Sequence, residues 1–237
     1  MKNKFGFILV KTQLGENIGA CARSMKNFGF SKLHIVSPKI NFPNHKTKAT
    51  SVGAYDIINK AKVFDNVEKS IEPFNLVIAL SARRRDINKR HISLNNFQNI
   101  IKKRQNLNIG FMFGPEASGL SNQDLSFSNY IMQIPTSTKF KSLNLSHSLT
   151  VICYEIFKLM NENKTKNNNF NLKISSKIKI SNIVRHLTSL LEKKDFFNPK
   201  EKKHSMLLNI NNLIYKLQPN DKELRILASI ISSLNKK

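Results

Sequence analysis

Three polar segments of the chain carry residue types that could bind and orient a ligand. They read GENIGACARSMKNFGF from Gly15, FGPEASGLSNQDL from Phe113 and IPTSTKFKSLNLSHSLTVICYE from Ile134. Each follows an apolar run of strand length, and ligands of open α/β sheets bind beyond the ends of the strands. The amide, hydroxyl, carboxylate and guanidinium groups of these segments therefore form the first candidates for a functional site.

The familiar phosphate-binding loops are absent from the sequence. Neither G-x-G-x-x-G nor G-x-x-x-x-G-K-[ST] occurs, although nucleotide-binding α/β proteins often carry one of them after the first strand. The turn after the first apolar run reads KTQLGENIGA, and its glycines are too far apart for a dinucleotide fingerprint. This disfavours a Rossmann dehydrogenase and an ordinary Rossmann methyltransferase.

Short apolar runs alternate with helical patterns over the first 160 residues. The runs cover residues 5–10, 32–37, 75–81, 108–114 and 130–135. Such alternation predicts an α/β domain with a largely parallel, buried sheet. Between the first two runs, apolar residues at helical spacing from Ile18 to Phe28 predict an amphipathic helix that ends at Gly29. Its polar face carries Arg23 and Lys26.

The rest of the chain predicts helices alone. An apolar stripe over residues 142–160 indicates the helix that closes a first domain, residues 1–160. Residues 161–175 are polar and lysine-rich without periodicity, which is typical of a linker. Three further helical patterns, about 176–194, about 200–217 and about 220–235, predict a small all-α extension over residues 176–237.

The charge balance favours a polyanionic partner. Lysine and arginine number 39 against 15 acidic residues, the formal net charge is +24 and the pI is about 10.2. Nucleic acid is the usual partner of such a chain, and a membrane surface is the competing polyanion. The sequence has neither a spanning apolar stretch nor a signal-peptide cleavage pattern, so we expect a cytoplasmic protein. Cys21 and Cys153 fall within helical patterns, which indicates buried thiols rather than a disulfide or a zinc site.

The three polar segments, in this order, resemble the three signature motifs of the SPOUT superfamily of RNA methyltransferases, in its 2'-O-methylating, SpoU-type branch. The strand end LSARRR, residues 80–85, resembles a further element of that family. The tail from Lys203 is similar to the C-terminal helices of the enzymes that methylate cytidine or uridine 32 in the anticodon loop of tRNA. The resemblance covers nearly the whole chain.

The resemblance implies a fold, a cofactor and a reaction. The expected fold is an α/β knot, in which the end of the catalytic domain threads through a loop as a deep trefoil knot and the knotted backbone binds S-adenosylmethionine. The expected reaction is methyl transfer to a ribose 2'-hydroxyl of tRNA by a homodimer, without a required metal. The alternatives are a related enzyme acting on ribosomal RNA or on another tRNA position, and a non-catalytic RNA-binding member of the fold.

The resemblance also assigns site residues. The expected catalytic residues are Arg23, Ser142, Asn144, Asn17 and Glu116. The expected cofactor-binding residues are Leu80, Ser81, Ala82, Gly114, Glu116, Ile134, Lys141, Ser142 and Leu143. The expected RNA-binding residues are Arg23, Lys26, Arg83, Arg84 and Arg85.

Several of these residues also have a purely structural interpretation. Asn17 could cap the first helix, and Ser142 could cap the helix predicted over residues 142–160, since both residue types are preferred at the N-cap. Glu116 could face the cationic cofactor and orient neighbouring main chain, or it could cap a short helix at LSNQDL, with Ser121 or Asn122 sharing that work. The guanidinium of Arg23 makes a poor general base because it stays protonated, so we expect it to position phosphate and hydroxyl and to stabilise charge. A base role has also been proposed in the family.

Overall fold

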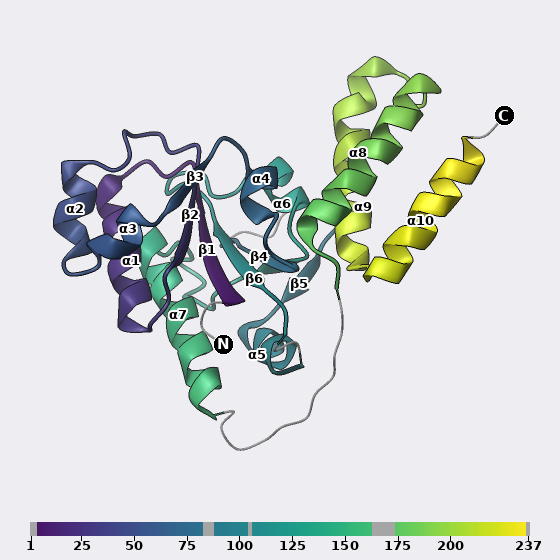
Figure 1. Ribbon diagram of the computed structural model, residues 1–237. Coiled ribbons are helices and arrows are strands. Elements are labelled where there is room, and N and C mark those ends of the chain that lie inside the picture. Colours follow the sequence, from purple (N-terminus) through teal and green to yellow (C-terminus); the bar gives the residue numbers. More distant parts are fainter. Residues whose placement is uncertain (1–3, 83–87, 104–105, 163–173, 236–237) are drawn as a thin grey trace.

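The computed structural model describes residues 4–82, 88–103, 106–162 and 174–235. Seven strands of these residues form one parallel sheet in the order β3-β2-β1-β6-β4-β7-β5 (Figure 1). In chain order the strands are β1 (Phe5–Val10), β2 (Lys32–Val36), β3 (Lys62–Phe64), β4 (Leu76–Leu80), β5 (Arg90–Ile92), β6 (Ile109–Phe113) and β7 (Tyr130–Met132).

Helices connect the strands and continue beyond the last of them. The described helices of the first 162 residues are α1 (Gly15–Asn27), α2 (His45–Ser51), α3 (Tyr55–Asn59), α4 (Val67–Ile71), α5 (Leu94–Lys103), α6 (Asn122–Ser126) and α7 (Leu145–Glu162). The C-terminal ones are α8 (Lys177–Lys193), the 3₁₀ turn η3 (Lys200–Lys202), α9 (Lys203–Leu217) and α10 (Asp221–Leu234).

The sequence-based prediction of a parallel α/β sheet with a helical C-terminal extension is confirmed, with two omissions. All five apolar runs form strands, and α1 ends before Gly29, whose φ of +75° suits glycine. Strands β3 and β5 were not predicted. Each has three residues and partly polar, exposed side chains, so neither produces the buried apolar run by which the other strands were found.

Each face of the sheet builds its own apolar core. Successive side chains of a strand point to opposite faces, so Phe7 of β1 packs in one core and Ile8 in the other. The first core includes residues of α1, α5 and α7. The second includes Ile180 of α8 and Ile214 of α9. The C-terminal helices thus help to cover the second face of the sheet (Figure 1). The division into domains and a linker stays a prediction, and residues 163–173 of that linker lie outside the described residues.

Two buried lysines join the C-terminal helices to the sheet. Lys177 is fully buried and Lys89 is 7% exposed, and both ammonium groups lie over the ring of Tyr215, at 4.8 Å and 5.8 Å from its centroid. Lys177 donates to the side-chain oxygen of Asn129, while Lys89 donates to the backbone oxygen of Ser126 at 2.8 Å. Burial lowers the pKa of both lysines, and it brings the pKa of Lys89 to about 7.

Replacing Lys89 should change how stability depends on pH. Its pKa in the unfolded chain is about 10.4, so the stability linked to its neutral form is complete above that pH and is lost as pH falls through about 7. Lys89→Met has no charge to bury. We therefore expect its melting temperature, relative to wild type, to be most favourable near pH 6 and to fall steadily toward pH 9.

Thermal unfolding of both proteins across this range measures the difference. Lys102→Met is the matched control, because Lys102 is exposed on α5 and its removal should leave the pH profile unchanged. A difference between Lys89→Met and wild type that is the same at pH 6 and pH 9 would contradict the account.

Candidate active site

A pocket of about 270 Å³ lies beyond the carboxyl ends of β4 and β6. Three stretches that are far apart in sequence form its wall: residues 80–82, residues 113–119, and residues between Ile134 and Ser148. All nine residues expected to bind the cofactor line this one pocket, namely Leu80, Ser81, Ala82, Gly114, Glu116, Ile134, Lys141, Ser142 and Leu143. The structure therefore brings the set together, and its binding role stays a prediction.

Glycines let the loop after β6 fold tightly at the pocket. A Cβ atom on Gly114 would lie 2.3 Å from the backbone nitrogen of Leu120 and 2.4 Å from the carbonyl carbon of Gly119. Gly119 has a φ of +68°, and its N–H donates to the oxygen of Pro115 at 2.9 Å. Only glycine fits at position 114 without moving the loop, so the pocket presents main chain on this side.

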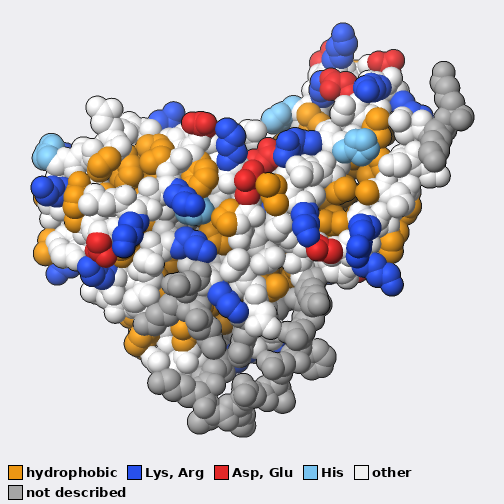
Figure 2. Space-filling view, viewed as in Figure 1, with side chains coloured by type: hydrophobic (Ala, Val, Ile, Leu, Met, Phe, Trp, Pro, Cys, Tyr) orange, Lys and Arg blue, Asp and Glu red, His pale blue; other side chains and the backbone are white. Residues whose placement is uncertain are grey.

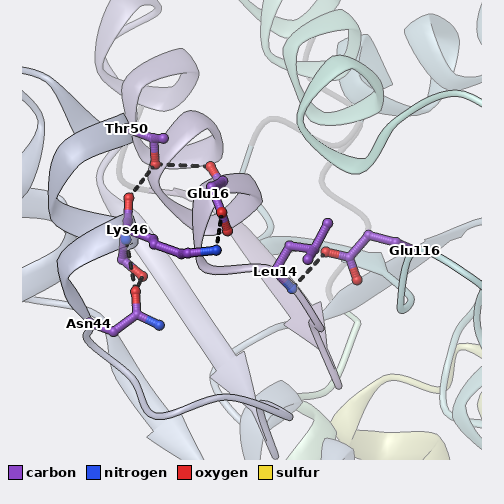
Figure 3. Close-up of polar contacts among 7 residues, drawn as sticks. Leu14, Glu16, Asn44, Lys46, Thr50 and Glu116 are labelled. Atoms are coloured by element: carbon purple, nitrogen blue, oxygen red, sulfur yellow. Dashed lines mark hydrogen bonds and ion pairs between the residues drawn. The ribbon is translucent and has the colours of Figure 1, made fainter.

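The carboxylate of Glu116 turns toward the start of α1. Its Oε2 accepts the backbone N–H of Gln13 at 2.9 Å, and its Oε1 accepts the N–H of Leu14 at 3.3 Å and the side-chain amide of Asn17 at 2.7 Å. Figure 3 shows the contact with Leu14. Leu14 is the N-cap of α1 and cannot cap the helix with its own side chain. Glu116 therefore satisfies amides at this helix start, where a negative charge is also favourable.

The short helix α6 has its own cap. Ser121 accepts the backbone N–H of Asp124 at 3.1 Å, and the Asp124 carboxylate accepts the N–H of Ser121 at 3.0 Å. This is a complete capping box. The interpretation that Glu116 caps the helix at LSNQDL is therefore wrong, whereas the capping role given to Ser121 is confirmed.

Asn17 and Asn144 extend the network into the third motif. The amide of Asn144 donates to the side-chain oxygen of Asn17 at 3.1 Å. The oxygen of Asn144 accepts the N–H of Ser146 at 2.8 Å, which caps α7. Two local predictions are thereby corrected: Asn17 lies inside the first turn of α1 rather than at its N-cap, and the cap of α7 is Asn144 rather than Ser142. One hydrogen-bonded path thus joins all three polar segments.

Helix α2 holds the other side of the same helix start. Lys46 forms an ion pair with Glu16 at 2.8 Å, and Thr50 donates to the backbone oxygen of Glu16 at 3.0 Å (Figure 3). A Cβ atom on Gly19 would lie 2.1 Å from Oγ1 of Thr50, so glycine permits this close approach of α1 and α2. The first turn of α1 is therefore held between α2 and the loop after β6. Sequence reasoning missed this contribution of α2.

Two of the expected RNA-binding residues, Arg23 and Lys26, do not line the pocket. Arg23 is exposed on α1, does not line the pocket and forms no hydrogen bond or ion pair with another described residue. Lys26 is tied to the turn before α3, because its ammonium donates to the oxygen of Gly53 and to Asp56, both at 2.7 Å. Residues 83–85, the three consecutive arginines, lie outside the described residues.

The described residues give no indication of a metal centre. They contain no group of three or more histidine, cysteine, aspartate or glutamate side chains that could hold an ion. Cys21 and Cys153 are free and buried, and burial raises the pKa of both thiols, so neither is a reactive nucleophile. No helix in the described part of the chain is long and apolar enough to cross a membrane.

Strands that are far apart in the sequence are neighbours in this parallel sheet, and three loops at its carboxyl edge build the pocket. These features define a methyltransferase of the SPOUT α/β-knot class. Within that class, the chain belongs to the SpoU rRNA methylase family, whose family model matches residues 4–154.

The similar proteins include both sequence relatives and solved structures. The tRNA (cytidine/uridine-2'-O-)-methyltransferase TrmJ of Photorhabdus laumondii is 28% identical over 239 residues, which cover all of this chain and 98% of the relative. The crystal structure of TrmJ from Z. mobilis ZM4 is 29% identical with a TM-score of 0.87, covering 98% of this chain and 99% of that one. The SpoU methyltransferase AviRb from Streptomyces viridochromogenes, solved in complex with AdoMet, is 17% identical with a TM-score of 0.56, covering 68% and 60%.

Glu116→Gln should loosen the start of α1 without removing the pocket. Gln keeps one acceptor oxygen but replaces the other with an N–H donor, which faces the amide donors of the helix start. We expect the free energy of unfolding to fall by about 1–3 kcal/mol, as for other hydrogen bonds to charged groups. We also expect methyl transfer to fall more than cofactor affinity, since the carboxylate binds α1 rather than the pocket interior.

Denaturant unfolding, calorimetry of cofactor binding and a methyl-transfer assay test these expectations together. Glu201→Gln is the matched control, because Glu201 is exposed in η3, far along the chain from this network. Unchanged stability of Glu116→Gln, with a loss confined to cofactor affinity, would show that the carboxylate acts on the cofactor instead.

Proposed function

We propose that this protein transfers the methyl group of S-adenosylmethionine to a ribose 2'-hydroxyl of tRNA, at the pyrimidine of anticodon-loop position 32, and that it works as a cytoplasmic homodimer. The observation that carries the proposal is the convergence of the three motif segments. Nine expected cofactor residues line one pocket, and Glu116, Asn17 and Asn144 join the segments by hydrogen bonds.

The pocket suits a nucleoside cofactor. Leu80, Ile134 and Leu145 offer apolar surface for an adenine, while the glycine loop offers main-chain groups, and this mixture is typical of small-molecule sites. The Gly114 position supports the fit, since a side chain there would displace the loop. The bound sulfonium would supply its own electrophilic methyl group, so the reaction needs no metal in principle. The AdoMet complex of AviRb supports the same choice of cofactor for this fold.

The residues of the chain would act mainly by positioning. Methyl transfer requires the attacking oxygen in line with the breaking bond, and holding that geometry can supply much of the rate. Ser142 lines the pocket, and Asn144 is held at the start of α7 beside Asn17. The guanidinium of Arg23 would hold an RNA phosphate and stabilise the negative charge on the 2'-oxygen as its proton passes to water, the bond to the methyl carbon forms and S-adenosylhomocysteine leaves.

A second subunit would complete each site. Arg23 does not line the pocket of its own chain, and its side chain is exposed and unpaired among the described residues. Leu14, directly before α1, and Tyr154 on α7, which packs against α1, are exposed apolar side chains as well. We therefore place Arg23 of the partner subunit against the pocket of each protomer. This arrangement explains why a residue so exposed would still be needed for catalysis.

The C-terminal helices favour tRNA over ribosomal RNA as the substrate. The family model ends at residue 154, whereas the matches to the two TrmJ proteins extend over the whole chain or nearly so, including α8 to α10. The Photorhabdus laumondii relative, whose name specifies tRNA, thus shares the extension. A basic chain of net charge +24 would also bind the phosphate backbone strongly at low salt.

Mixed dimers should reveal the shared site. We expect Arg23→Ala and Gly114→Val to be inactive in methyl transfer to tRNA when each is tested alone. In a mixed dimer, one of the two sites combines the intact arginine of one subunit with the intact pocket of the other. Because half of randomly formed dimers are mixed, co-refolding equal amounts should restore about a quarter of wild-type activity.

Two controls make this result interpretable. Arg23→Ala alone should still bind the cofactor, and Gly114→Val alone should not, as calorimetry can measure. If the mixture stays inactive although mixed dimers form, each subunit must supply its own arginine and the proposed arrangement is wrong.

A further inference from the structure

A second cavity, of about 220 Å³, lies where α4 and α6 face α8 and α9. Figure 1 shows these four helices beside one another, between the sheet and the C-terminal end of the chain. Figure 2 shows a notch between the body of the molecule and the lobe that carries α8 to α10. The proposed methyl-transfer site makes no use of this cavity, because the two sets of lining residues do not overlap.

The floor of the cavity is formed by aromatic side chains that are held by contacts with their neighbours. Phe127 and Tyr215 contact each other edge to face, with ring centroids 5.9 Å apart at 89°. The hydroxyl of Tyr215 lies 2.7 Å from the hydroxyl of Ser181, and both side chains are buried. Leucines of α9 continue this apolar surface. The buried Tyr215 thus supports Phe127 from below, and a planar ring could pack against Phe127 and these leucines.

The rim of the cavity is polar and largely uncommitted. The side chains of Gln123 on α6, and of His204 and Asn211 on α9, form no hydrogen bond with another described residue. Each amide offers both donors and an acceptor, which is the pattern that reads the edge of a nucleobase. Arg185 of α8 contacts Glu68 at 3.5 Å with 64% of its side chain exposed. An ion pair this exposed contributes little, and the guanidinium keeps further donors for an anion.

We propose that this cavity binds one unstacked nucleotide of the RNA substrate, other than the nucleotide that is methylated. Its base would lie against Phe127 and the leucines of α9, the amides of Gln123 and Asn211 would bind the base edge, and Arg185 would bind the phosphate. This inference rests on the proposed function, since it assumes an RNA substrate. Sequence-specific recognition of RNA commonly uses such splayed bases on aromatic side chains.

The surroundings of the cavity support an RNA chain rather than a free nucleotide. The end of α8 and the turn η3 carry exposed lysines that would continue the contact along an RNA backbone, namely Lys193, Lys194, Lys200 and Lys202. Helix α6, which supplies Gln123, directly follows the loop that lines the cofactor pocket. A nucleotide held at α6 would therefore anchor the RNA close to the site of methyl transfer.

The double variant Gln123→Ala/Asn211→Ala tests the proposal. Both side chains lie on the rim, and their removal leaves the aromatic floor of the cavity intact. We therefore expect normal thermal stability and unchanged cofactor affinity. We expect the Kd for unmodified tRNA to rise by about five- to tenfold, as for the loss of a side-chain contact to a base edge. The matched control is Asn122→Ala/Asn209→Ala, which removes two exposed amides of the same helices that do not line the cavity. It should bind tRNA as wild type does.

Each outcome decides a different question. If wild type fails to bind tRNA at all, the proposed function fails; if wild type and the double variant bind it equally, only the cavity proposal fails. Adding millimolar AMP or CMP provides a second arm, monitored by ligand-observed NMR. Binding of the free nucleotide that the double variant loses, without any change in tRNA affinity, would assign the cavity to a small molecule and overturn the RNA assignment. If the double variant loses both tRNA affinity and binding of the free nucleotide, the result supports the proposal that the cavity binds a nucleotide of the RNA.

Discussion

The carboxylate of Glu116 is the group on which the architecture of the candidate active site depends. It lies in the loop after β6 and accepts hydrogen bonds from the start of α1, about a hundred residues earlier in the chain. Asn17, held by that carboxylate, in turn accepts from Asn144 at the start of α7. The loop after β6, helix α1 and the start of α7 are thus connected through one charged group. In this strongly basic protein, an acidic side chain thus links the parts of the site by hydrogen bonds.

The same region shows how the fold holds the functional side chains in place. Helix α1 is held at its first turn by α2 on one side and by Glu116 on the other, and its later turns carry Arg23 outward. The pocket itself belongs to loops beyond the strand ends, where glycine at position 114 allows main chain to approach a ligand. Rigid placement of these parts is what a reaction governed by in-line geometry requires.

The C-terminal helices contribute to the same structural unit through the second face of the sheet. Their apolar side chains pack on that face, and the buried ammonium groups of Lys89 and Lys177 lie around Tyr215 at the junction. Hydrogen bonds to Asn129 and to backbone oxygens satisfy these charges, but desolvation still disfavours them. Retaining two such groups in a hydrophobic junction points to a requirement for one defined arrangement of helices against the sheet.

The sequence predicted the parts of the site better than the connections among them. Apolar runs and helical periodicity located the buried strands, α1 and the C-terminal helices, because each of those signals is local. Strand β5 was missed since Arg90 and His91 leave no apolar run. The resemblance located the residues that line the pocket. The partners of Glu116 could not be foreseen, because two of them are backbone amides and amides leave no trace in a sequence. The cavity at α6 and α9 was missed for a related reason: its polar rim forms only when two distant helices pack together.

The most direct test of the central claim is methylation of unmodified tRNA with a labelled methyl group on S-adenosylmethionine, followed by digestion to nucleosides and mapping of the label. The account predicts a 2'-O-methylated pyrimidine at position 32, with no label on ribosomal RNA under the same conditions. Label on a base, on ribosomal RNA, or at another tRNA position would contradict it.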